Sequence, residues 1–289
     1  MKWSQHFVIL YSVLGAASYG FAAVLQHKAA SSEAPELTMK LGLIWSLLKK
    51  PIWLLANVLD ALGFVFQFLA LRKGALAVVE PILVMSLVFA LAGASIIRRV
   101  KPPLSDTISA VVVTIGVGVF LDAARPSQVI HRVHPFGWAT LTILTALLTI
   151  VGVLISRGGS PKRAAICLAA ASGFDLGYMA SMAALTGKIF NHGVIHTLST
   201  GAPYALALSG FLSILLVQSA FQAGPLRFSL PLISVMQPVI GIIIGEILLG
   251  QRVNFHGIAP LLEVLSLVVM TGGVIFLARG TVGETMGGG

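Results

Sequence analysis

The sequence predicts an all-α membrane protein with about nine transmembrane helices, arranged as an inverted-topology repeat. Of its 289 residues, 57% are hydrophobic and 10% are charged, whereas a soluble domain usually carries about 25% charged residues. The mean hydropathy is +0.95. Because one water-soluble core cannot bury this much apolar surface, lipid must be the solvent for most of the chain.

Nine apolar runs are each long enough, or nearly so, to cross about 30 Å of hydrocarbon as a helix. None shows the period-two alternation of barrel strands. Glycine, proline and basic residues separate the runs and predict helix ends there. The predicted spans are Phe7–Leu25, Ile52–Leu71, Ala75–Ile97, Ser105–Leu121, Phe136–Ile155, Ala164–Leu185, Ala202–Gln222, Phe228–Leu249 and His256–Ala278.

Two short apolar segments lie between these runs. Residues 41–48 are too few to span and lie between Lys40 and Lys49-Lys50, so we expect an interfacial or half-inserted helix. The alternative for residues 41–48 is a tenth transmembrane helix. Ile189–Thr200 holds a comparable place later in the chain.

The basic residues indicate orientation rather than a nucleic-acid partner. The net charge is +9, but the lysines and arginines occur in short groups between apolar runs, as the positive-inside rule requires. Of the 19, twelve fall on one side of the predicted topology and the other seven on the opposite side. This split predicts a multi-pass protein of the inner or plasma membrane, with the N-terminus outside and the C-terminus in the cytoplasm.

An internal repeat accounts for the order of the spans. Four residues around one turn reappear at a constant offset, and turn residues match as well as apolar ones. The pairs are Ala70 and Ala220, Gly74 and Gly224, Leu76 and Leu226, and Pro81 and Pro231. Corresponding helices are five crossings apart, an odd number, so the two copies have opposite orientations.

The repeat divides the chain into four parts. Residues 1–126 hold helices one to four with the short interfacial helix 41–48, and residues 127–160 hold a connecting fifth helix. Residues 161–279 hold helices six to nine. Residues 280–289 are predicted to be a disordered tail.

At these residues the chain resembles the drug/metabolite transporter (DMT) superfamily, and within it the NIPA-type magnesium transporter and EamA-like branch. The resemblance runs from Gly15 to about Pro126 and more weakly from Ala169 to Arg279. The family pattern is a Gly-Glu-x-x-Asn-Phe helix that leads to a Thr-Pro pair. The agreeing residues are Gly63, Phe68, Ala70 and Pro81, and the turn 49–53 and the stretch 116–126 also fit.

Departures from this pattern fall on oxygen-bearing residues. The family Glu falls on Phe64, the Asn becomes Gln67, and an acidic turn usual after the third helix is here the basic segment 98–101. The resemblance therefore implies the fold more strongly than it implies magnesium specificity, because a hard cation requires carboxylate or carbonyl oxygens.

Charged residues inside a span are costly and therefore mark candidate sites. Asp60 and Asp175 lie near the middle of the second and sixth spans, where a carboxylate can bind a cation or carry a coupling proton. The alternative for both is a structural hydrogen bond to a neighbouring helix. For Glu80, a salt bridge to Arg72 or Lys73 near the outer surface is favoured over a role in the site.

Other polar residues complete the candidate set. Gln67, Gln218 and Gln237 are uncharged polar groups within spans, and Gln237-Pro238 either breaks or kinks the eighth span. Glu246 and Glu263 either pair with Arg252 and His256 or line an entry funnel. Two histidine pairs lie in loops without an evident third ligand, so a metal site is not assigned; they are His131 with His134 and His192 with His196.

These observations together predict a transporter. The chain has no Walker loop, nucleophile elbow, HExxH or dinucleotide fingerprint, so we expect neither an enzyme nor a cofactor. We expect a secondary transporter of a small solute, with helices two, three, six, seven and eight lining the cavity. The alternatives are a NIPA-like magnesium permease, a non-transporting membrane subunit or a lipid flippase. For the oligomeric state, a homodimer is an alternative to a monomer.

Overall fold

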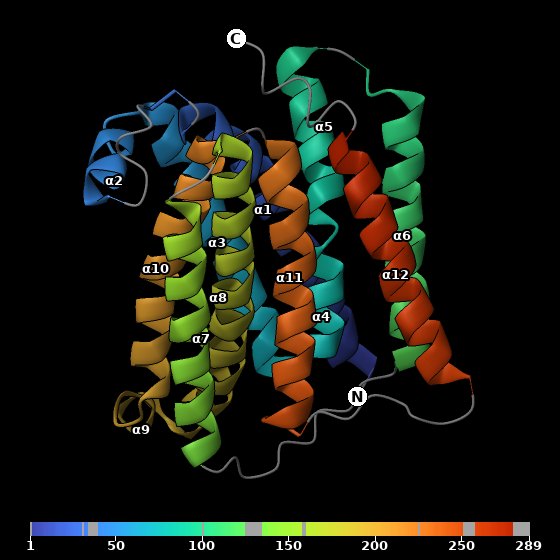
Figure 1. The fold of residues 1–289 in the computed structure, drawn as a ribbon. Coiled ribbons are helices and arrows are strands. Elements are labelled where there is room, and N and C mark those ends of the chain that lie inside the picture. The colour runs from blue at the N-terminus through green and yellow to red at the C-terminus, as the bar shows by residue number, and fades with distance from the viewer. Residues whose placement is uncertain are drawn as a thin grey trace.

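The computed structural model describes residues 2–30, 32–33, 40–99, 101–124, 135–157, 160–224, 226–250 and 258–279. Over these residues the chain is a bundle of helices without β-strands (Figure 1), which confirms the all-α prediction. The helices are α1 (Lys2–Ala30), α2 (Leu41–Leu47), α3 (Pro51–Lys73), α4 (Leu76–Leu83), α5 (Ser86–Arg98), α6 (Leu104–Ala124), α7 (Pro135–Ser156), α8 (Pro161–Ile189), α9 (Val194–Leu198), α10 (Ala202–Ala223), α11 (Leu226–Ile247) and α12 (Ala259–Arg279). The predicted tail 280–289 lies outside the described residues.

Nine helical stretches of the described chain are long and apolar enough to span a membrane, and they correspond to the nine predicted runs. The helices α1 and α8 extend several residues beyond the predicted apolar runs at both ends. Large apolar side chains cover the outer faces, as Ile143, Leu147 and Leu154 do on α7. Such faces are stable only against lipid.

The two short segments form short helices. The helix α2 has seven residues and α9 has five, so neither spans the membrane. Figure 1 shows α2 at the same end of the bundle as the last residues of α12, and α9 at the opposite end with the first residues of α1. The first residues of α1 and the last residues of α12 thus lie at opposite ends, as an odd number of spans between them requires.

The residues that were predicted to separate the spans lie at the ends of the helices. Pro51 is at the start of α3, where its missing N–H has no helical partner to lose. The Ser160 side chain accepts a hydrogen bond from the backbone N–H of Arg163 at 3.4 Å and caps α8. Gly74 and Gly224 follow the last residues of α3 and α10.

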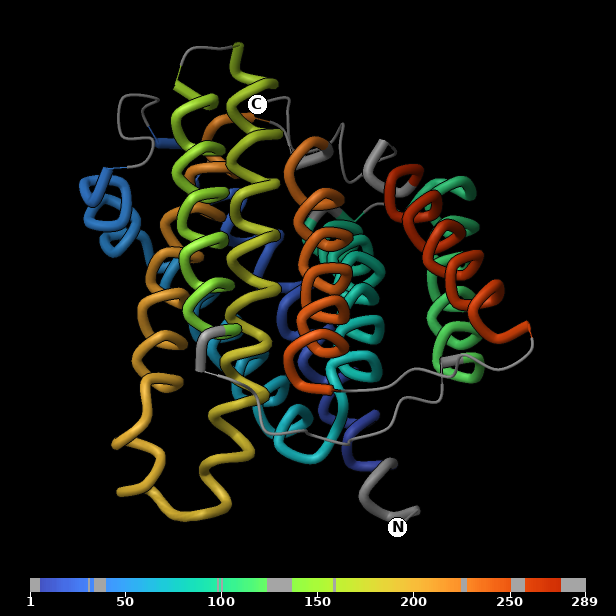
Figure 2. The backbone as a smooth tube through the Cα atoms, turned by 60° about the horizontal axis from the view of Figure 1, so that its bottom comes forward, coloured from blue at the N-terminus to red at the C-terminus, as the bar shows by residue number. Residues whose placement is uncertain are grey.

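The helices of the two predicted halves make similar contacts, and the inverted repeat itself stays a prediction. The helix α1 packs along α3 and α5, and α8 packs along α10 and α11 in the same way. The helices α6 and α12 pack against each other at one side of the bundle (Figure 2). The helix α7 packs on α8, and α4 and α11, whose first residues Leu76 and Leu226 correspond in the repeat, also contact each other.

The third span is broken in its interior. The sequence predicts one helix over Ala75–Ile97, but α4 ends at Leu83 and α5 begins at Ser86. Pro81 has no N–H to donate. At the break the bonds tighten to a three-residue spacing, with Val84 N donating to the Pro81 carbonyl at 3.2 Å and Met85 N donating to the Ile82 carbonyl at 3.0 Å.

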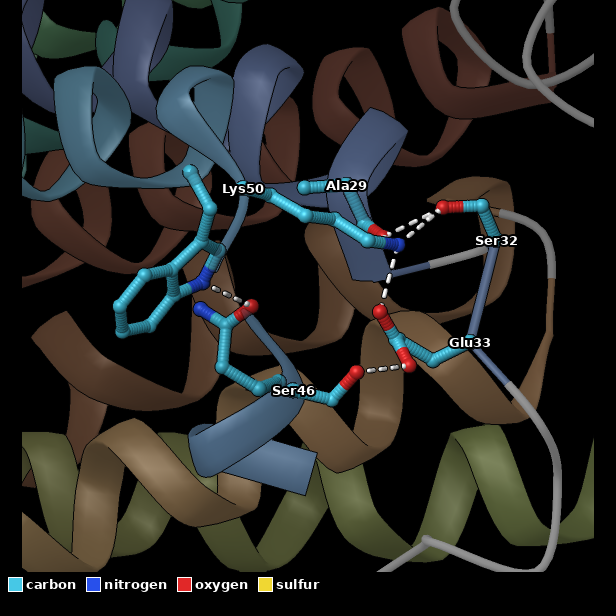
Figure 3. A network of polar contacts seen from close by, with 7 residues as sticks. Ala29, Ser32, Glu33, Ser46 and Lys50 are labelled. Atoms are coloured by element: carbon cyan, nitrogen blue, oxygen red, sulfur yellow. Dashed lines mark hydrogen bonds and ion pairs between the residues drawn. The ribbon is translucent and has the colours of Figure 1, made fainter. Parts of the chain in front are cut away.

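A polar network fixes α2 against the ends of α1 and α3 (Figure 3). The Lys50 ammonium lies 2.5 Å from a Glu33 carboxylate oxygen and donates to the Ala29 carbonyl at 3.2 Å and to the Ser32 hydroxyl at 2.6 Å. The Ser46 hydroxyl of α2 donates to the other Glu33 oxygen at 2.6 Å. The network satisfies the exposed end of α1 without adding a span.

We expect the Glu33 contribution to stability to depend on pH. Burial raises the pKa of the Glu33 carboxyl, but hydrogen bonds from Lys50 and Ser46 and the Lys50 charge outweigh burial and hold the pKa below its ordinary value of 4.5. A lowered folded-state pKa stabilises the fold above 4.5, and this contribution is lost as pH falls through the folded-state value. Glu33→Gln should therefore lower stability by about 1 kcal/mol near neutral pH, and the difference from the native protein should vanish in acid. Thermal unfolding of both proteins from neutral pH into acid measures the difference in stability. A difference that does not change with pH would contradict the interpretation.

The close contact between α1 and α5 depends on Gly20. A Cβ at Gly20 would overlap the Ser86 carbonyl and lie 2.7 Å from the Phe89 Cβ. We expect Gly20→Ala to force the two helices apart and to destabilise the protein by about 1–3 kcal/mol. Gly118→Ala is the matched control, since a Cβ there meets nothing within 4 Å. Equal thermal unfolding midpoints for the two variants would show that this contact is not required.

Candidate functional site

A cavity of about 680 Å³ lies at the centre of the bundle, between the two halves of the chain. Its walls come from α1, α3, α4 and the start of α5 on one side, and from α8, α10 and α11 on the other. Of the 29 lining residues, 18 are apolar, glycine or proline and 11 carry polar side chains, a mixture that suits small organic molecules. The five predicted lining helices are confirmed, and α1 is an addition to them.

Glu80 lies at the junction of the two halves and is completely buried. One carboxylate oxygen accepts a hydrogen bond from the Gln67 amide at 3.0 Å, and the other accepts one from the Gln237 amide at 3.1 Å. The Tyr19 hydroxyl donates to the Gln67 amide oxygen at 2.6 Å. Four helices, α1, α3, α4 and α11, thus meet in one polar network in the cavity wall.

The predicted salt bridge of Glu80 to Arg72 or Lys73 is wrong. The α4 helix turns the Glu80 side chain inward, and Gly241 of α11 leaves room for it, since a Cβ there would lie 3.2 Å from the Glu80 Cγ. Arg72 instead donates to the Asn191 side-chain oxygen at 3.0 Å. Arg72 and Lys73 are close to Glu80 in the sequence, but the packing of α4 against α11 brings the Gln237 amide to the carboxylate instead.

Asp60 lines the cavity near the middle of α3. Its carboxylate makes no hydrogen bond or ion pair with any residue that the structure describes. Asp60 lies seven residues before Gln67, so both project from one face of α3 about 10 Å apart along its axis. The Tyr19 ring packs over Gly63 between them, where an added Cβ would lie 2.8 Å from the ring.

Asp175 is placed differently from the other candidates. It is 2% exposed, and its two carboxylate oxygens accept hydrogen bonds from Ser209 at 3.1 Å and Ser213 at 2.6 Å, both on α10. Ser213 lines the cavity, whereas Asp175 lies behind it. This is the geometry of the alternative interpretation, a hydrogen bond to a neighbouring helix, so a role in transport stays a prediction.

The small residues around Asp175 allow close packing rather than unwinding. The helix α8 runs without interruption from Pro161 to Ile189. Added Cβ atoms at Gly173 and Gly177 would lie 2.5 Å from the Met236 Cβ and 2.7 Å from the Ile240 Cβ of α11. The backbone of α8 therefore approaches α11 directly at these glycines.

The remaining glutamines both lie at the cavity. Gln218 lines it and accepts a hydrogen bond from the Trp53 indole at 3.2 Å, which joins α10 to α3. Of the two alternatives for Gln237-Pro238, the break is not found, since α11 runs through Pro231 and Pro238 without a gap. The break lies instead in the third span.

The outer candidates do not form a metal centre in the part of the chain that the structure describes. No three His, Cys, Asp or Glu residues gather there. The rings of His192 and His196 lie 6.0 Å apart on an exposed turn. Four further residues considered in the sequence analysis lie outside the described residues; they are His131, His134, Arg252 and His256.

Sequence reasoning missed Tyr19, Trp53, Ser209 and Ser213. Each carries a polar atom inside an apolar run, which is a weak signal in a span because most such groups bond to their own helix. The spacing of Ser209 and Ser213, four residues apart, puts them on one face of α10. Only the tertiary structure shows which carboxylate they face.

The chain is similar in sequence to a curated protein. The chain is 25% identical over 274 residues to a functionally uncharacterised protein of Corynebacterium glutamicum, covering 93% of this chain and 94% of the relative. No protein-family model matches, and no solved structure matches. The alignment thus runs over nearly the whole length of both chains.

Asp175 gives a test of the hydrogen bonds in the α8–α10 contact. Asp175→Ala leaves the Ser209 and Ser213 hydroxyls without their partner and should destabilise the protein by about 1–3 kcal/mol. Asp175→Asn keeps the shape and can still accept a hydrogen bond, so it should lose less. Thermal unfolding in detergent measures both. If Asp175→Asn unfolds like the native protein but abolishes transport, the predicted functional role is retained; if it transports normally, Asp175 is structural.

Proposed function

We propose that the protein is a secondary transporter that moves a small solute across the cell membrane by alternating access. The observation that carries the proposal is the central cavity, which lies between two similarly packed groups of helices and carries a buried polar network. Transporters of this kind place their binding site near the membrane midplane, at the interface of inverted repeats. The drug/metabolite transporter resemblance agrees with this assignment.

The network at Glu80 offers a mechanism for coupling the two halves. Gln67 belongs to the first half and Gln237 to the second, and both donate to the same carboxylate. Movement of α11 away from α3 must break one of these hydrogen bonds. A solute or a proton that occupies the vacated carboxylate oxygen would then favour the alternative arrangement, since a ligand shifts an equilibrium by its different affinity for the two states.

The break between α4 and α5 supports the same assignment. Ser86, the first residue of α5, lines the cavity. Discontinuous helices direct backbone groups to the binding site in many secondary transporters. The break gives α4, which carries Glu80, a natural point of movement relative to α5.

An organic solute is better supported than magnesium. Magnesium demands near-ideal octahedral coordination by oxygen and usually keeps several of its waters. Each oxygen of Glu80 already accepts an amide hydrogen bond, and most of the cavity wall is apolar. The orientation with the N-terminus outside and the C-terminus in the cytoplasm is part of the proposal.

The test compares strains that carry the native protein, no protein, or Glu80→Gln. Metabolites inside the cells and in the medium are quantified by mass spectrometry, and solutes that differ are then tested in proteoliposomes. We expect the deletion to change the distribution of at least one small solute, and Glu80→Gln to reduce its accumulation roughly tenfold or more. The variant keeps the size of the side chain but cannot accept from both amides as an anion.

Asp122→Asn is the matched control, because Asp122 is exposed on α6 and outside the cavity. It should transport like the native protein. If no solute moves in cells or in proteoliposomes, a non-transporting subunit or a lipid flippase replaces the proposal, and scrambling of fluorescent lipids distinguishes these two. Magnesium uptake by the native protein would instead establish the permease alternative.

A further inference from the structure

The charges that line the cavity have one sign. Among the described residues of its wall, Asp60 and Glu80 are charged, and no lysine, arginine or histidine is present. The nearest base on α3, Arg72, is held by Asn191 and lies over the Phe190 ring with its guanidinium carbon 5.1 Å from the ring centre. These contacts turn Arg72 towards the end of the bundle, not into the cavity.

The hydrogen bonds at Glu80 do not cancel its charge. Both of its partners, Gln67 and Gln237, are neutral amides. Neutral donors favour the ionised form of a carboxylate but leave its negative charge to act on its surroundings. Around a buried side chain such as Glu80 this field is stronger than it would be in bulk water.

Asp60 adds a second negative charge with a free face. It has no hydrogen-bond or ion-pair partner among the described residues. Tyr19 lies close enough to Asp60 and Glu80 for both carboxylates to act on it electrostatically. An aromatic ring near two carboxylates suits a positive charge, because the ring face also attracts cations.

The rest of the wall is suited to an apolar body rather than to a hydrated metal ion. Phe64, Leu206 and Ile233 line it from α3, α10 and α11. Neutral polar side chains such as Asn57 and Gln218 also line the wall but are fewer than the apolar ones, and they replace the waters of an inorganic cation less well than a cluster of carboxylates would. A cavity of about 680 Å³ has the size of sites for drug-sized molecules.

We infer that the cavity binds an organic cation, with an ammonium-type or guanidinium head near Asp60 and Tyr19 and an apolar body against the wall. Asp60 supplies the ion pair and Glu80 supplies the surrounding negative potential. The inference rests on the proposed function, because it names the class of solute that the transporter would carry.

The probes for the test are tetraphenylphosphonium and tetraphenylborate, which share a shape and differ in the sign of their charge. Binding to the protein in lipid nanodiscs is measured by equilibrium dialysis, with empty nanodiscs subtracted. We expect tetraphenylphosphonium to bind saturably and at least about tenfold more tightly than tetraphenylborate, which corresponds to about 1.4 kcal/mol.

Variants at Asp60 connect the preference to the structure. Asp60→Asn should weaken tetraphenylphosphonium binding by about tenfold or more, and Asp60→Glu should restore part of it. Asp122→Asn removes the same charge from an exposed site outside the cavity and should bind within about twofold of the native protein. Thermal unfolding of each variant confirms that it is folded.

The outcomes separate this inference from the proposed function. Equal binding of both probes, tighter binding of tetraphenylborate, no binding of tetraphenylphosphonium, or unchanged binding by a folded Asp60→Asn overturns the cation site. If transport of a neutral or anionic solute is found at the same time, the transporter proposal still stands. If tetraphenylphosphonium binds through Asp60 but no solute is moved, the cation site stands and transport fails.

Discussion

Hydrocarbon provides no hydrogen-bond partners, so a polar group that this chain carries into the membrane is costly unless it finds a partner inside the bundle or faces a cavity. The backbone does so by forming helices. The side chains do so across helices: Glu80 between Gln67 and Gln237, Asp175 at two serines of α10, and Gln218 at Trp53. These bonds decide which helices must lie together, and two of the three groups lie at the cavity.

Close helix packing brings the donors and acceptors of these hydrogen bonds within reach of each other. Without a hydrophobic driving force between helices in lipid, small residues allow backbones to approach. Gly20 brings α1 against α5, Gly177 brings α8 against α11, and Gly241 leaves space for Glu80. The cavity lies among these closely packed helices.

Much of the fold could be predicted because membrane helices are encoded locally. Length and hydropathy predict the nine spans, and Gly74, Gly224 and the prolines near them mark the turns. The candidate carboxylates and glutamines were also recognisable, because polar groups are rare inside spans. Their roles were not: Glu80 finds a partner 157 residues away, while Asp175 lies behind the cavity wall.

The sequence by itself determined the class of the protein, the number of spans, their ends and the set of polar residues within them, since each depends on the properties of a continuous segment. Only the tertiary structure decided that α1 lines the cavity, that the third span is broken beyond Pro81, and that Asp60 faces the cavity without a partner. These features depend on which helix faces meet. Packing between segments far apart in the chain sets those faces, and no local pattern records it.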